Sequence, residues 1–119
     1  MNDERLNVLQ QLTEGVTLTI TSYSDNLMAS RLIFQAKATA PLHHHPEDEL
    51  HTVLSGRFEC TIDGKVQVLE TGDSVHVRPD QVHSLHALEA GEILTVWGPV
   101  RNDLLKIFVR GPGRPVLEG

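Results

Sequence analysis

Hydrophobic and polar residues alternate with a period of two along most of the chain. In GVTLTITSY (15–23), for example, Val16, Leu18 and Ile20 alternate with threonines. Successive side chains of a β-strand point to opposite faces, so this alternation predicts a strand with one buried face. The same reasoning predicts further strands at 27–34, 49–56, 57–62, 65–70, 74–78, 83–88 and 92–97.

Glycine, proline and aspartate separate these segments. Asp63–Gly64 predicts a tight hairpin turn, and TGD (71–73) and EAGE (89–92) predict two more turns. Short strands joined by such turns favour an antiparallel sandwich or barrel. The sequence therefore predicts an all-β fold, a single domain over residues 1–119 with its core at about 16–100.

Three segments depart from the strand pattern. Residues 4–12 alone resemble a helix, whereas 101–108 (RNDLLKIF) is compatible with one or two helical turns or with an extended segment. The Gly- and Pro-rich end, about 108–119, predicts an irregular tail.

Composition narrows the class of protein. A chain of 119 residues with 39% hydrophobic and 22% charged residues is typical of one soluble domain. A net charge of −6 disfavours general binding to nucleic acids or anionic membranes. The single cysteine, Cys60, excludes an internal disulfide framework. With no apolar run of signal-peptide or membrane-spanning length, we expect a cytoplasmic protein.

The candidate chemistry lies in PLHHHPEDEL (41–50), which places three histidines beside three carboxylates. In a strand His43 and His45 share one face and His44 points away, towards solvent. Glu49 has the same parity as His43 and His45, and His83 follows the RPDQV turn as a fourth donor. Two readings stay open: a transition-metal site and a metal-free polar pocket.

The spacing around this run resembles the first motif of the cupin family. It has the form His43-x-His45-x-x-x-Glu49 followed after six residues by Gly56, and only the leading glycine is replaced, by Lys37.

The second cupin motif is matched by GDSVHVRPDQVHSLHA (72–87). Gly72 and His83 are present, Arg78 and Asp80 stand at the proline and glycine positions, and Ala87 replaces an asparagine. Two motifs at the correct separation are more specific than either alone.

The resemblance, over roughly residues 16–100, implies a small β-barrel of the jelly-roll (double-stranded β-helix) type, commonly a homodimer. One divalent metal would be bound at its mouth by His43, His45, Glu49 and His83, with open positions for water or substrate. His and Glu ligands accept nickel, zinc, manganese or iron, so the sequence does not name the metal.

Other residues have more than one interpretation. His51, in phase with Glu49, is either a packed histidine or a pocket residue that bonds the ligands or acts as a general base. His86 is out of phase with His83 and is expected on the opposite face. The direction of His76 is not fixed by the pattern, and Cys60 is expected in the core.

Stretches outside the two motifs, among them SYSDNLMASRLIF and VLSGRFECTIDGK, are similar to the KdgF-like cupins, which linearise 4,5-unsaturated monouronates. The similarity implies that Arg101 holds the substrate carboxylate and that Trp97 stacks on the sugar. Arg101 is equally well read as a salt-bridge partner of Asp103. The similarity also implies that Thr95 stands at the position of the group's proton-transferring aspartate, and a threonine hydroxyl cannot serve near neutral pH. Either His51 or another pocket group has taken the role, or the protein has another function.

Two further functions compete with uronate linearisation. Three histidines and one carboxylate can hold Fe(II) with sites open for dioxygen, as in a metal-dependent dioxygenase. A non-catalytic cupin that binds a small anionic sugar-derived ligand is the other alternative.

Overall fold

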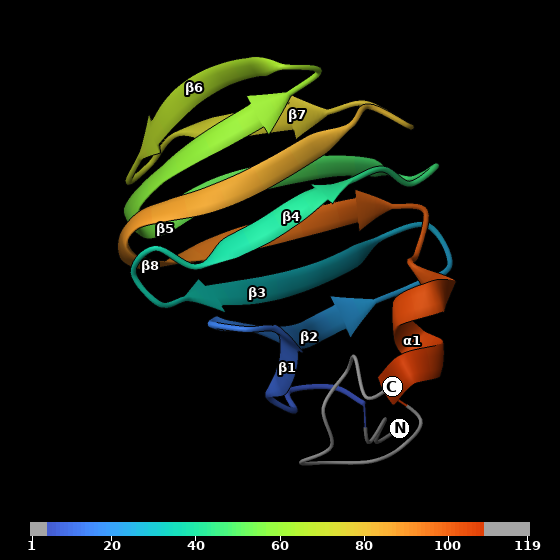
Figure 1. The fold of residues 1–119 in the computed structure, drawn as a ribbon. Coiled ribbons are helices and arrows are strands. Elements are labelled where there is room, and N and C mark those ends of the chain that lie inside the picture. The colour runs from blue at the N-terminus through green and yellow to red at the C-terminus, as the bar shows by residue number, and fades with distance from the viewer. Residues whose placement is uncertain (1–4, 109–119) are drawn as a thin grey trace.

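The computed structural model describes residues 5–108, which form eight strands and one helix (Figure 1). In chain order these are β1 (Gln10–Thr13), β2 (Val16–Tyr23), β3 (Met28–Phe34), β4 (Thr39–His43), β5 (Asp48–Ile62), β6 (Lys65–Glu70), β7 (Ser74–Val77), β8 (His83–Gly98) and α1 (Asn102–Phe108). All strand pairs are antiparallel. The strands stack from β6 at the top of Figure 1 to β1 at the bottom.

The two long strands, β5 and β8, pair with each other along most of their length and each takes part in two layers. The second half of β8 pairs with β3 and its first half pairs with β4. Likewise the first half of β5 pairs with β7 and its second half with β6. The ladder does not close on itself, but the jelly-roll arrangement predicted for the chain is confirmed.

β5 and β8 change layer where two glycines meet. A Cβ atom on Gly91 would lie 2.2 Å from the carbonyl oxygen of Ser55, and one on Gly56 would lie 2.8 Å from the Cα of Gly91. The pairing register shifts at the same place, between Val53 and Phe58. Glycine is required here because the two backbones approach too closely for any side chain.

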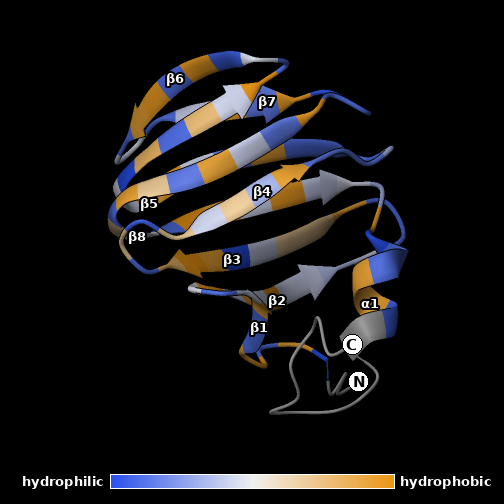
Figure 2. Cartoon of the chain, in the orientation of Figure 1, coloured by the Kyte–Doolittle hydropathy of each residue, from blue (hydrophilic) through white to orange (hydrophobic). Residues whose placement is uncertain are grey.

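The core lies between the layers and is built by the alternating residues. Val16, Leu18 and Ile20 are fully buried, and the rings of Phe34 and Phe58 pack edge to face with centroids 5.1 Å apart. Figure 2 shows the alternation of hydrophobic and hydrophilic residues along the strands. This pattern confirms the predicted strands at 15–23 and 27–34 to within a residue.

The predicted turns have mixed outcomes. Asp63 and Gly64 adopt φ angles of 48° and 80°, which is the left-handed geometry of a tight hairpin turn. The turn predicted at 89–92 is wrong, because β8 runs through it without a break. Similarly, the segments predicted as separate strands at 49–56 and 57–62 are one strand.

At the two ends of the described chain, the helix predicted at 4–12 is wrong. Residues 5–7 form a turn and Gln10–Thr13 form β1, because pairing with β2 satisfies the backbone there. Of the two possibilities for 101–108, the helical one holds over Asn102–Phe108. The predicted irregular tail lies almost wholly outside the described residues. Within residues 5–108 no helix is long and apolar enough to cross a membrane.

Candidate metal centre

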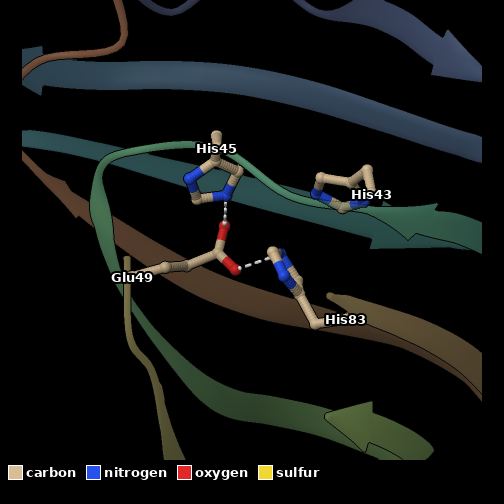
Figure 3. Close-up of side chains that lie close together, drawn as sticks. All are labelled: His43, His45, Glu49 and His83. Carbon is tan, nitrogen blue, oxygen red and sulfur yellow. Dashed lines mark ion pairs between the residues drawn. The ribbon is translucent and has the colours of Figure 1, made fainter. Parts of the chain in front are cut away.

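Three strands bring the four candidate ligands together. His43 ends β4 and pairs directly with His83, the first residue of β8, while Glu49 lies near the start of β5. His45 lies in the short connection between β4 and β5. One donor atom from each residue lies within 4.8 Å of every other, with the three rings around the Glu49 carboxylate (Figure 3). The four residues named from the sequence, three by parity and His83 by the second motif, therefore lie close together, and their role as metal ligands stays a prediction.

The backbone fixes which nitrogen each ring presents. Nδ1 of His43, His45 and His83 lies 2.7, 3.1 and 2.8 Å, respectively, from a backbone carbonyl oxygen. A carbonyl oxygen only accepts hydrogen bonds, so Nδ1 carries the proton and Nε2 of the neutral ring keeps a lone pair. This is the hydrogen bonding expected of metal-binding histidines.

The presented nitrogens of His45 and His83 have no hydrogen-bond partner of their own. Nε2 of His83 lies 2.8 Å from Oε2 of Glu49, and Nε2 of His45 lies 3.3 Å from Oε1. Neither contact has the alignment of a hydrogen bond, and both nitrogens are buried. Lone pairs that face a carboxylate at this distance repel each other unless a cation lies between them. The donor set therefore fits a divalent metal.

The protonation of the cluster follows from burial and from the shared carboxylate. His43 is the exposed member of the four, and the partial burial of its ring lowers its pKa. Burial also disfavours the charged form of His83, but the Glu49 carboxylate outweighs this and raises the pKa of His83. Burial alone would raise the pKa of Glu49, yet His51, His45 and His83 together hold it well below its usual range. Glu49 is thus ionised and ready to bind a cation.

Of the four residues, His43, Glu49 and His83 line a cavity of about 330 Å³. Its walls include leucines from four different strands, namely Leu12, Leu18, Leu32 and Leu85. Its polar lining includes His51, Trp97, Arg101 and Asp103 as well as the candidate ligands. A mostly apolar cavity with a few convergent polar groups is the usual form of a small-molecule site.

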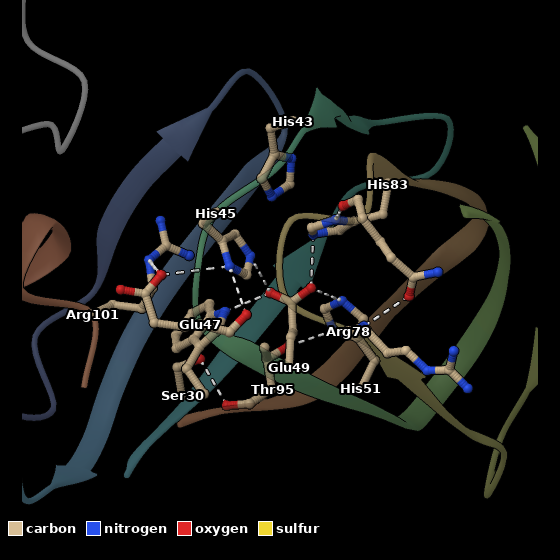
Figure 4. A network of polar contacts seen from close by, with 12 residues as sticks. Ser30, His43, His45, Glu47, Glu49, His51, Arg78, His83, Thr95 and Arg101 are labelled. Atoms are coloured by element: carbon tan, nitrogen blue, oxygen red, sulfur yellow. Dashed lines mark hydrogen bonds and ion pairs between the residues drawn. The ribbon is translucent and has the colours of Figure 1, made fainter. Parts of the chain in front are cut away.

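His51 lies in this cavity, as the pocket interpretation of the sequence expected. Its Nε2 atom is 2.8 Å from Oε2 of Glu49, and its Nδ1 atom is 2.8 Å from Oγ1 of Thr95 (Figure 4). Thr95 is fully buried, and its backbone oxygen accepts a hydrogen bond from the hydroxyl of Ser30. Thr95 therefore contacts His51, which in turn contacts Glu49.

Trp97 and Arg101 lie beside the cluster. The indole N–H of Trp97 donates to Oε1 of Glu49 at 2.5 Å, which orients the carboxylate. Arg101 packs with its guanidinium carbon 5.2 Å from the Trp97 ring centroid. It also forms a two-pronged pair with Asp103, at 2.9 and 2.7 Å. The predicted salt bridge with Asp103 is therefore present, whereas the role of Arg101, which lines the cavity, in holding a substrate carboxylate stays a prediction.

Glu47 is the residue at this site that sequence reasoning missed. Its Oε1 atom is buried without a hydrogen bond, 3.6 Å from Nε of Arg101 and 3.6 Å from Nδ1 of His45. Glu47 shares the parity of His45 and Glu49, a signal that could have identified it. The proline at position 46 hides the signal, because it interrupts the strand.

The remaining histidines and the cysteine lie away from the cavity. His44 is exposed, and His86 bonds Thr39 on the face opposite to His83. His76 points outward and pairs with Asp48 at 2.6 Å, which settles its direction. Cys60 is buried in the core, where burial raises the pKa of its thiol to about 11.

Comparison with known proteins identifies the family. Residues 30–97 match the cupin domain family. The chain belongs to the cupin family. This cupin is 32% identical over 98 residues to the pectin degradation protein KdgF of Dickeya dadantii, covering 81% of this chain and 89% of that protein.

Solved structures support the assignment. An RmlC-like cupin from Shewanella frigidimarina superimposes with a TM-score of 0.78 and 25% identity, over 87% of this chain and 92% of its own. KdgF from a Halomonas species gives a TM-score of 0.77 and 25% identity, over 87% and 98%. The resemblance inferred from the sequence is confirmed at the level of fold and family.

At the two motif positions where glycine is replaced, the backbone of this cupin still has the left-handed conformation that glycine favours. Lys37 and Asp80, which stand at the two glycine positions, have φ angles of 69° and 63°. Both lie in the left-handed region that glycine adopts without strain. The N–H of Asp80 donates to the backbone oxygen of His45 at 2.8 Å, so the strained turn supports a candidate ligand directly.

Proposed function

We propose that this cupin binds one divalent metal through His43, His45, Glu49 and His83 and opens the ring of 4,5-unsaturated monouronates. The observation that carries the proposal is a single cavity lined both by three of these donors, His43, Glu49 and His83, and by Arg101. The likeness to KdgF, a protein named for pectin degradation, supports a uronate as substrate.

The substrate is a cyclic hemiacetal with a C4=C5 enol ether and a carboxylate. A bound metal would act as a Lewis acid on the sugar oxygens. Arg101 would hold the carboxylate through its guanidinium fork, and the face of Trp97 would support the ring. These contacts fix the anomeric hydroxyl and C4 relative to the proton-transferring group.

His51 is the residue we propose for proton transfer. Its Nε2 atom takes the proton of the anomeric hydroxyl while the C1 carbonyl forms and the ring C1–O bond breaks. The electron pair passes to the ring oxygen and through the enol to C4, which receives a proton. The product is the open-chain keto-aldehyde isomer, so the reaction consumes no oxidant and releases no group. Thr95 holds His51 in place from the Nδ1 side.

The test is to follow the absorbance of an unsaturated galacturonate with the metal-loaded protein under anaerobic conditions. Ring opening removes the conjugated enol ether, so absorbance should fall faster than in buffer. Turnover that requires oxygen and iron would instead support the dioxygenase alternative. Tight binding of the uronate with no turnover would support a non-catalytic binding protein.

The assembly and domain assignments stay predictions. We propose that the protein forms a homodimer, because exposed edge strands in small open barrels are commonly covered by a partner. Sedimentation at micromolar concentration tests this, and a monomer would contradict it. Residues 1–119 are proposed to form one domain.

A further inference from the structure

One guanidinium at the mouth of the cavity is shared by two carboxylates. Arg101 contacts Asp103 with two hydrogen bonds and Glu47 with one looser contact of 3.6 Å. The Arg101 side chain is only 11% exposed, and among the groups that line the cavity its positive charge is the one that suits an anionic ligand.

The two carboxylates differ in how firmly they are held. The Glu47 side chain is 14% exposed and lies between Arg101 and His45. The Asp103 side chain is 59% exposed and sits in the first turn of α1, at the solvent side of the cavity. If the Asp103 carboxylate left Arg101, it would therefore return to water. Moving the Glu47 carboxylate would instead require a rearrangement beside the candidate metal centre.

The Asp103 carboxylate contacts Arg101 in the way that the carboxylate of a bound substrate would. Nε and Nη2 of Arg101 each donate to a separate oxygen of Asp103, the two-pronged arrangement with which arginine binds a carboxylate. A third carboxylate beside one guanidinium would be repelled by the other two. Asp103 occupies the Nε/Nη2 edge of the guanidinium, so a uronate that binds at this edge competes with Asp103 for these two donors.

We propose that Asp103 occupies the carboxylate subsite of Arg101 in the ligand-free protein and is displaced by the carboxylate of the substrate. This inference rests on the proposed function, since it takes a uronate as the ligand. Glu47 keeps Arg101 aligned during the exchange. Asp103 thereby selects for ligands whose carboxylate binds Arg101 more tightly than the Asp103 carboxylate does. A neutral sugar cannot replace the ion pair between Asp103 and Arg101 and so gains nothing from displacing Asp103.

The experiment is isothermal titration calorimetry of the metal-loaded protein with D-galacturonate, which is saturated and therefore binds without reacting. The Asp103→Asn variant removes the competing charge and keeps the side-chain size. Because an exposed ion pair contributes little, we expect galacturonate to bind about two- to fivefold more tightly to the variant. Binding of the neutral methyl ester should stay unchanged.

The matched control is Asp25→Asn, which removes the same charge from an exposed residue whose backbone oxygen bonds Val100, next to Arg101. It should leave galacturonate affinity as it is. A second measurement needs no variant: the NMR resonance of the Arg101 Nε–H should shift on addition of galacturonate but not of the methyl ester.

Unchanged or weaker binding of galacturonate to Asp103→Asn would overturn the inference, as would equal tightening in Asp25→Asn. So would an unshifted Arg101 resonance, or no galacturonate binding to either protein. The anaerobic ring-opening assay then decides separately whether the proposed function also fails, because turnover without displacement of Asp103 contradicts only the present inference.

Discussion

Nδ1 of His51 lies 2.8 Å from the hydroxyl oxygen of Thr95, and this pair is buried next to the Glu49 carboxylate. The bond leaves Nε2 of His51 directed at the candidate metal centre and the cavity. Thr95 cannot transfer a proton itself, but it fixes the ring that can. The pair supports the proposal that His51 transfers the proton, since no carboxylate stands at position 95.

If His51 transfers the proton, His51→Ala should lower kcat for ring opening by about a hundredfold or more, since general acid–base catalysis contributes that much. The KM should change little, because carboxylate binding belongs to Arg101. His86→Ala is the control, as His86 lies on the opposite face and bonds Thr39. Steady-state kinetics that show full turnover in His51→Ala would exclude this role.

Stabilisation by metal should grow as the pH rises. In the metal-free protein Glu49 raises the pKa of His83, so their pairing stabilises the fold below about pH 6.5 and is lost as the pH rises through the raised pKa. Metal binding needs neutral imidazoles and has the opposite dependence. The increase in Tm on adding zinc should therefore be larger at about pH 7.5 than at about pH 5.5.

The ligand assignment is checked in the same melting experiment. The double variant His43→Ala, His83→Ala should show no zinc-dependent rise in Tm, whereas His44→Ala should behave as the unaltered protein. A zinc effect that is equal at both pH values, or that survives in the double variant, contradicts the proposed site.

Cys60 should be inert in the folded protein. Burial raises the pKa of its thiol to about 11, so almost no thiolate is present near neutral pH, and the side chain is 1% exposed. A thiol reagent such as iodoacetamide should label the protein only after unfolding in urea. The chain has one cysteine, so mass spectrometry reads the result directly. Rapid, complete labelling without denaturant would show that the core opens.

Lys37→Gly should raise the free energy of unfolding by up to about 1 kcal/mol. Lysine at a φ of 69° is strained by about 1–2 kcal/mol, and the greater freedom of glycine in the unfolded chain offsets part of the gain. The N–H that donates to Ala87 is kept. Urea titration measures the change. Lys65→Gly, in ordinary strand geometry, is the control and should destabilise the protein.

Local alternation was sufficient to predict β2 and β3, because each has one face in the core and the pattern follows directly. It failed at Gly56 and Gly91, which resemble turn residues in the sequence. Their role depends on two distant strands crossing in close contact, and no local pattern records that approach. The helix predicted at residues 4–12 was wrong for a related reason, because the pairing of β1 with β2 outweighs a weak helical preference.

The candidate site was predictable where its residues are close in sequence. His43, His45 and Glu49 follow from parity, and the cupin motifs supplied His83, which the antiparallel pairing of β4 with β8 brings to His43. The contact between Glu47 and Arg101, and the bond between His51 and Thr95, join residues that no spacing rule connects. Those contacts required the fold.

The most direct test is a proton NMR time course of 4,5-unsaturated galacturonate in D₂O with the metal-loaded protein. The C4 vinylic signal should disappear much faster than in buffer, and one deuteron should appear at C4 of the open-chain product. The double variant His43→Ala, His83→Ala should match buffer. If the fully metal-loaded protein leaves the vinylic signal decaying at the buffer rate, this cupin does not linearise unsaturated uronates.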